Sequence, residues 1–128
     1  MSTLKDSIVD KLVDGKLTCA GAFDIALEHK VDPIEVGKEA TRSGIRISRC
    51  QLGLFGYEDL GSKRIVQEAQ EVAPKLKRAI ESKLEKGELS CKGAWDISSE
   101  LTVPKLAVAG AAEKMSLRFR KCQLGCFA

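Results

Sequence analysis

The feature that most constrains the fold is an internal repeat that covers most of the chain. Displacing the 128-residue sequence by 72 positions aligns residues 11–56 with residues 83–128 without a gap, and 19 of the 46 aligned pairs are identical. Both copies contain the pattern G-x-L-[ST]-C-x-G-A-[FW]-D-I and end in R-x-x-[RK]-C-Q-L-G-x-F. Two copies are too few for a solenoid, so the repeat predicts two similar lobes packed about a pseudo-two-fold axis.

Within the first copy, the spacing of apolar residues predicts three helices. Apolar residues recur at helical spacing over residues 4–13 and 22–30, and the Asp32-Pro33 pair has the residue types of a cap and a first helical turn. Gly44 then stands where a glycine commonly ends a helix. The same order is expected in the second copy.

Outside these helices, two further elements are predicted. Residues 45–54 change to the alternating pattern of a strand followed by a return strand, and a short extended piece at residues 17–19 is expected to pair with this hairpin. Residues 62–72 carry apolar side chains at helical spacing, which predicts a connector helix ahead of Pro74. The predicted fold is mainly α with short β-hairpins, divided into a first repeat at 1–58, a connector at 59–73 and a second repeat at 74–128.

Three helices and a hairpin form the outline of a winged helix-turn-helix. The segment FDIALEHKVDPIEVGKEA resembles the helix-turn-helix core of bacterial regulators, with Ala26 as the small residue where the two helices cross and Val31 in the turn. WDISSELTVPKLAVAGAA repeats the pattern in the second copy, and the CQLG segments resemble those of small uncharacterised proteins that carry such a domain. The resemblance implies two tandem winged helix-turn-helix lobes and a small transcriptional regulator that binds double-stranded DNA.

The third helices depart from that family, because a recognition helix normally offers polar or basic side chains to base edges. The first copy presents Asp32 and Glu35 there, and residues 104–115 of the second copy are apolar almost all round. Basic residues instead gather on or just after the third helices, where a wing touches phosphates. The candidate nucleic-acid-binding residues are Lys38, Arg42, Arg46, Arg49, Lys114, Arg118, Arg120 and Lys121.

The charge is unequally divided between the halves. Residues 1–58 contain 8 basic and 9 acidic residues, a net charge of −1, whereas residues 59–128 contain 13 and 9, a net charge of +4. The total of +3 is too small to establish a polyanionic partner by itself. An alternative function is therefore a protein-protein interaction or self-assembly module, in which Pro104–Met115 is buried against the connector, the other lobe or a second chain.

The five cysteines, an odd number, suggest thiols or metal ligands rather than disulfides. Four of them occupy two equivalent positions in each copy, and one is unique to the second copy. They admit two interpretations: small buried hydrophobes at strand edges, or a thiol or metal sensor. The residues concerned are Cys19, Cys50, Cys91, Cys122 and Cys126.

No recognised catalytic motif occurs, and His29 is the only histidine, so no catalytic residues are assigned and a non-enzymatic protein is expected. No cofactor is expected beyond a metal at the cysteines. The chain has no apolar stretch of membrane-spanning length, and its first residues are charged where a signal peptide is apolar. A cytoplasmic location without a membrane partner is the resulting expectation.

Overall fold

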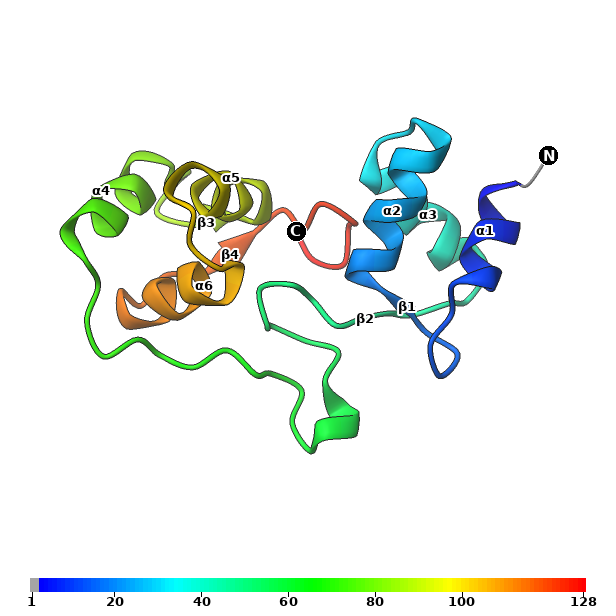
Figure 1. Ribbon diagram of the computed structural model, residues 1–128, viewed down its shortest axis with the longest axis horizontal. Coiled ribbons are helices and arrows are strands. Elements are labelled where there is room, and N and C mark those ends of the chain that lie inside the picture. The colour runs from blue at the N-terminus through cyan, green and yellow to red at the C-terminus, as the bar shows by residue number, and fades with distance from the viewer. Residues whose placement is uncertain (1–2) are drawn as a thin grey trace.

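The computed structural model describes residues 3–128, and in that range it is mainly helical with two small two-stranded sheets (Figure 1). The first lobe holds α1 (Leu4–Asp10), β1 (Leu17–Thr18), α2 (Cys19–His29), α3 (Pro33–Arg42) and β2 (Ile47–Ser48). The second holds α4 (Pro74–Ser82), β3 (Leu89–Ser90), α5 (Cys91–Leu101), α6 (Lys105–Lys114) and β4 (Phe119–Arg120). The same order of elements in both lobes follows the sequence repeat. None of the described helices is both long and apolar enough to cross a membrane.

Equivalent residues begin the helices of the two lobes. The hydroxyl of Thr18 accepts a hydrogen bond from the Gly21 amide at the start of α2, at 3.0 Å, and the hydroxyl of Ser90 accepts one from Gly93 at the start of α5, at 2.9 Å. These caps satisfy amides that the first turn of a helix leaves unpaired. A capping box around Thr3 begins α1 in the same way. Local capping therefore sets the helix starts that the repeat predicts.

The β-hairpins predicted at the ends of the repeats are not formed. β2 pairs with β1, and β4 with β3, and both pairs are parallel. The predicted pairing of the short extended piece at residues 17–19 with the strand after the third helix is confirmed. The predicted return strand is not formed, so that prediction is wrong. The chain reverses after each of β2 and β4, and Arg49, Gly53 and Gly56 all adopt positive φ, which breaks the regular backbone of a strand.

The connector helix predicted for residues 62–72 is also wrong. Only a 3-10 turn, η1 (Glu58–Leu60), forms in the linker, and residues 62–73 are extended. This linker runs the length of the second lobe to reach α4 (Figure 1). Twelve extended residues reach about 40 Å, whereas a helix of that length reaches about 18 Å. The amides of Ile65 and Ala69 instead donate to the carbonyls of Gly53 and Gly110, at 2.9 and 3.0 Å.

The reversals after β2 and β4, which we call loop 49–56 and loop 121–128, are exchanged between the lobes. Leu52 is fully buried in the core of the second lobe, although its sequence belongs to the first repeat. Leu124, its equivalent, is buried in the core of the first lobe. Loop 49–56 therefore completes the lobe of the second repeat, and loop 121–128 completes the lobe of the first (Figure 1).

The exchanged loops lie on the third helices. A Cβ built on Gly37 in α3 would lie 1.9 Å from the carbonyl oxygen of Leu124, and one on Gly125 would lie 2.7 Å from the side chain of Ile34. In the other lobe, a Cβ on Gly53 would lie 2.6 Å from the side chain of Leu106, which is the repeat equivalent of Ile34. Each loop thus approaches the third helix of the opposite lobe at matching positions.

The middle of helix α6 is buried within its own chain. Five consecutive residues, 108–112, are buried, as expected from their apolar character. They face the core of the second lobe on one side, while the linker covers another, with the Gln67 carbonyl 2.6 Å from the position of a Cβ on Gly110. The burial expected for Pro104–Met115 is found only at residues 108–112, because Pro104, Leu106, Ala107 and Lys114 are exposed. The extended linker supplies part of the cover that we expected from a connector helix, the other lobe or a second chain.

Candidate functional site

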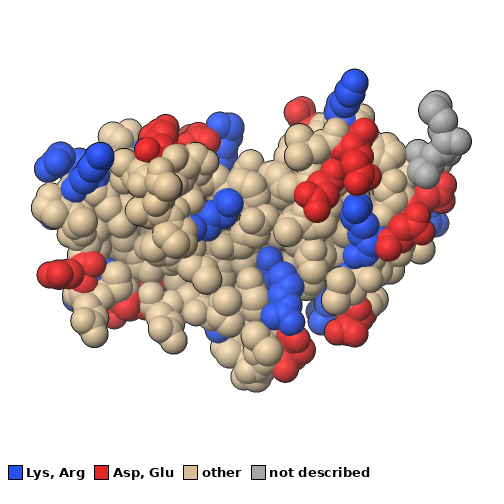
Figure 2. Space-filling model, in the orientation of Figure 1, with Lys and Arg blue, Asp and Glu red and all other residues tan. Residues whose placement is uncertain are grey.

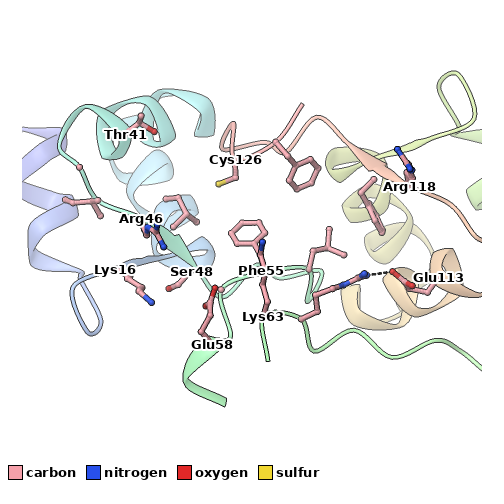
Figure 3. Close-up of a pocket in the computed structure, with 18 of the residues that line it drawn as sticks. Lys16, Thr41, Arg46, Ser48, Phe55, Glu58, Lys63, Glu113, Arg118 and Cys126 are labelled. Carbon is pink, nitrogen blue, oxygen red and sulfur yellow. Dashed lines mark hydrogen bonds and ion pairs between the residues drawn. The ribbon is translucent and has the colours of Figure 1, made fainter. Parts of the chain in front are cut away.

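A groove of about 1010 Å³ lies between the two lobes and is lined by residues from both repeats and from the linker. Figure 3 shows Arg46 and Arg118 on opposite sides of Phe55 and Cys126, with Lys63 below them. Six pairs of lining residues are separated by 72 positions and are thus repeat equivalents. The pairs are Arg46 with Arg118, Phe55 with Phe127, Ile45 with Leu117, Ile47 with Phe119, Leu54 with Cys126, and Thr41 with Glu113.

The fold itself places these pairs. Arg46 and Arg118 each directly precede the short strand that follows the third helix, and their carbonyls accept hydrogen bonds from Leu17 and Leu89, at 2.9 and 3.0 Å. The two phenylalanines are each the last residue but one of an exchanged loop. The amide of Cys50 donates to the Phe55 carbonyl at 3.2 Å, and Cys122 makes the same bond to Phe127 at 3.1 Å. Backbone bonds therefore hold the arginines and aromatic rings at fixed positions.

The groove carries more positive than negative charge. Its lining includes five cations and two carboxylates, and the side chain of Arg64 pairs with that of Glu113. The other four cations have no ion-pair partner among residues 3–128. They are Lys16, Arg46, Lys63 and Arg118. Because the cations outnumber the carboxylates, the groove favours an anion over a cation.

The eight basic residues expected to bind nucleic acid do not form one group in the structure. Lys38, Arg42, Arg49 and Lys121 form ion pairs with carboxylates. Arg120 is half-buried and donates to the Glu85 carbonyl at 3.2 Å. Three of the eight remain exposed and without an ion pair in the described part of the chain, namely Arg46, Lys114 and Arg118. Two of these three line the groove.

Three of the five cysteines are buried where the lobes meet. The Cys19 sulfur accepts a hydrogen bond from Gln51 at 3.6 Å, and Cys91 accepts the equivalent bond from Gln123 at 3.4 Å. Burial raises the pKa of Cys19 to about 12 and also raises the pKa values of Cys50 and Cys91. These three thiols are neutral at physiological pH, which is the behaviour of small apolar side chains.

The other two cysteines lie in loop 121–128 and interact with each other. The Cys126 thiol donates to the Cys122 sulfur, which also accepts from the backbone amides of Leu124, Gly125 and Cys126, so the pKa of Cys122 falls to about 6. The pKa of Cys126 is raised because its proton is held by Cys122. Cys126 is exposed and its sulfur faces into the groove (Figure 3).

Among residues 3–128, no three His, Cys, Asp or Glu side chains gather as metal ligands. A metal at the cysteines stays a prediction.

We expect alkylation of the folded protein to distinguish these two classes of thiol. At pH 7 iodoacetamide should modify the Cys122–Cys126 pair and leave Cys19, Cys50 and Cys91 intact, because only the thiolate reacts. The rate at the pair should fall as the pH drops through about 6, where Cys122 gains a proton. Mass spectrometry of peptides gives the rate for each cysteine.

The variant Cys126→Leu supplies the control for this measurement, because leucine occupies the equivalent position 54 in the first repeat. It removes the thiol donor, so the midpoint for Cys122 should rise toward the ordinary value of 9.0. A midpoint that stays near 6 in this variant, or equally rapid alkylation of Cys19 in the parent, would contradict the assignment.

The comparisons with known proteins do not assign this arrangement to a family. No family model, curated protein or solved structure matches the chain. The function must therefore be argued from the site itself.

Sequence reasoning found part of this site and missed the rest. It selected Arg46 and Arg118 because they recur at equivalent positions after the third helices. It did not select Lys16 and Lys63, which reach the groove from a turn and from the linker, and no local pattern indicates either. The two phenylalanines carried a signal, since the last aromatic residue of the repeat is identical in both copies.

Proposed function

We propose that this protein is a non-enzymatic binding protein whose partner is double-stranded DNA, held through its phosphate backbone. The observation that carries the proposal is the position of Arg46 and Arg118. Both are exposed, both lack an ion pair in the described chain, and both line one groove from opposite lobes. Lys16 and Lys63 line the same groove and add positive charge. Cations presented together in this way attract phosphates and release their counterions.

We interpret the lobes as helix-turn-helix-like modules related by an approximate two-fold axis. Phe23 and Trp95 are repeat equivalents, and their ring centroids lie 4.3 Å apart, as expected for residues near such an axis. The equivalent bonds of Gln51 to Cys19 and Gln123 to Cys91 support the same relation. An axis of this kind would present the two arginines symmetrically to a duplex.

The proposed contact does not use the third helices. An exchanged loop lies against one face of each helix, and the linker lies against another face of α6. The exposed cations of α3, Lys38 and Arg42, are held in ion pairs with Glu35 and Glu39, whereas a recognition helix keeps such side chains free to read base edges. On the face in Figure 2, basic and acidic side chains are interspersed, so that face offers no continuous cationic surface. Binding should accordingly be weak, with little preference among sequences.

We test this proposal with fluorescence anisotropy of a labelled duplex of mixed sequence. Three phosphate contacts should weaken binding by roughly 40-fold between about 50 and 200 mM salt. The double variant Arg46→Ala, Arg118→Ala should lower the affinity for all duplexes alike and flatten the salt dependence by about two contacts. This is the effect expected of residues that bind phosphates and not bases.

The matched control is Lys75→Ala, Arg78→Ala, which also removes two exposed cations but does so on α4, at the far end of the second lobe. It should leave the salt slope close to that of the parent. An Arg46→Ala, Arg118→Ala variant with the parent's affinity and salt slope would refute the proposal.

A further inference from the structure

The groove between the lobes has an apolar part that a DNA backbone would not use. Phe55 and Phe127 line it from the two exchanged loops, and both rings are half-buried. Ile45 and Leu117, which follow the third helices, contribute aliphatic side chains to the same lining. Phosphates gain nothing from such a surface, whereas an apolar molecule gains free energy in proportion to the area that it buries.

The size of the groove restricts the occupant further. Its volume of about 1010 Å³ corresponds to the upper end of the range found for small-molecule sites, which is roughly 300–1,000 Å³. An inorganic anion would fill only a small part of it and would leave the phenylalanines in water. An organic molecule of moderate size can contact the aromatic rings and a cation at once.

The charge of the groove restricts the sign of the occupant. Two of its unpaired cations, Arg46 and Arg118, come from the lobes, and Lys63 comes from the linker. Of its two carboxylates, Glu113 is already paired with Arg64. A guanidinium can hold a carboxylate, sulfonate or phosphate group with two parallel hydrogen bonds. The apolar lining and the cations therefore suit the two ends of one ligand.

We propose that this groove is a binding site for a small organic anion with an aromatic or otherwise apolar body. The apolar body would pack between Phe55 and Phe127, while the anionic group would pair with Arg46 or Arg118. This proposal is separate from DNA binding, and its test contains no DNA. A negative result for one therefore leaves the other standing.

The test uses the anionic aromatic probe 8-anilinonaphthalene-1-sulfonate, whose fluorescence rises in an apolar site. The folded parent should bind it at one saturable site, with thermal melting confirming that each variant is folded. The variant Arg46→Gln, Arg118→Gln should weaken binding about tenfold or more, because it removes both charged donors. Lys75→Gln, Arg78→Gln, with the same loss of charge on α4, should bind like the parent.

A neutral probe of similar shape, N-phenyl-1-naphthylamine, separates the two parts of the site. Its binding should be unchanged in the arginine variant and weakened in Phe55→Ala and in Phe127→Ala, because it needs only the apolar surface. Equal losses for the two probes in the arginine variant would show that the arginines do not hold the anionic group, and this would overturn the proposal.

Cys126 gives a second readout that needs no substitution, since it lines the same groove and is exposed. Saturating probe should slow alkylation of the Cys122–Cys126 pair severalfold in the parent. It should not do so in the arginine variant at the same probe concentration. Alkylation at an unchanged rate under saturation would place the probe outside the groove and overturn the proposal, even if the phenylalanine variants fail to fold.

Discussion

Replacing Gly37 by alanine is expected to destabilise the protein, although alanine is the better helix former. By intrinsic helix propensity alone, the change in α3 should stabilise by about 1 kcal/mol. The new Cβ would, however, lie 1.9 Å from the carbonyl oxygen of Leu124, a backbone atom that cannot move without the whole of loop 121–128. Displacing that loop would expose Leu124, and losing such a buried leucine costs about 3 kcal/mol.

Urea denaturation of Gly37→Ala should therefore show a lower free energy of unfolding than the parent, because the cost of displacing Leu124 exceeds the gain in helix propensity. A chain that lacks residues 122–128 provides the control, because the obstructing carbonyl is gone and the same substitution should there become stabilising. If Gly37→Ala stabilises the full chain, loop 121–128 does not lie against α3.

The second large effect is expected from Leu52→Ala, which should weaken the lobe encoded by the other repeat. Leu52 is fully buried and packs in the core with α5 and α6. Truncation should cost about 3 kcal/mol, within the range of 2–5 kcal/mol typical for buried leucines. Hydrogen exchange should accelerate first in α5 and α6, because local opening follows the loss of local packing.

Two leucines serve as controls for this measurement. Leu60 is 63% exposed, so Leu60→Ala should change stability by less than about 0.5 kcal/mol. Leu124→Ala should show the opposite pattern, with faster exchange in α2 and α3. Faster exchange in the first lobe of Leu52→Ala would mean that loop 49–56 packs on its own repeat.

The helices were predictable from sequence because their signals are local. Thr3 caps α1, and Pro33 opens α3 as its residue type indicates. Gly44 follows the end of α3 with a φ of +70°, a conformation that suits glycine. In each case the deciding interaction lies within a few residues along the chain.

The linker and the loops were not predictable because distant partners decide their structure. Ile65 and Ala69 have helical spacing, yet their amides donate to carbonyls outside the linker. The Ile65 amide bonds to Gly53 in loop 49–56, and the Ala69 amide bonds to Gly110 in α6. The exchange of Leu52 and Leu124 leaves no mark in the sequence either. The residues around a buried leucine form the same sequence pattern whether the leucine packs in the core of its own repeat or in that of the other.

The candidate site also has a part that was predictable from sequence and a part that was not. Arg46 and Arg118 could be selected from sequence because they recur at equivalent positions in both copies. A basic residue outside a helix does not recur in order to fill the core, so its repetition indicates a role at the surface. The groove could not be foreseen, because it exists only where two exchanged loops bring Phe55 and Phe127 between the lobes. Its cations include Lys16 and Lys63, whose neighbours along the chain are ordinary turn and linker residues.

The crossing of Leu52 and Leu124 also bears on how such a chain arises. In this structure each loop packs on the third helix of the other repeat. A polypeptide with only one copy would therefore lack the partner that receives its loop and covers its third helix. Two such polypeptides would satisfy each other as a homodimer. Joining them through the linker turns that association into an intramolecular one, which no longer depends on protein concentration. Separate chains of residues 1–58 and 59–128 should accordingly recover their structure only when mixed.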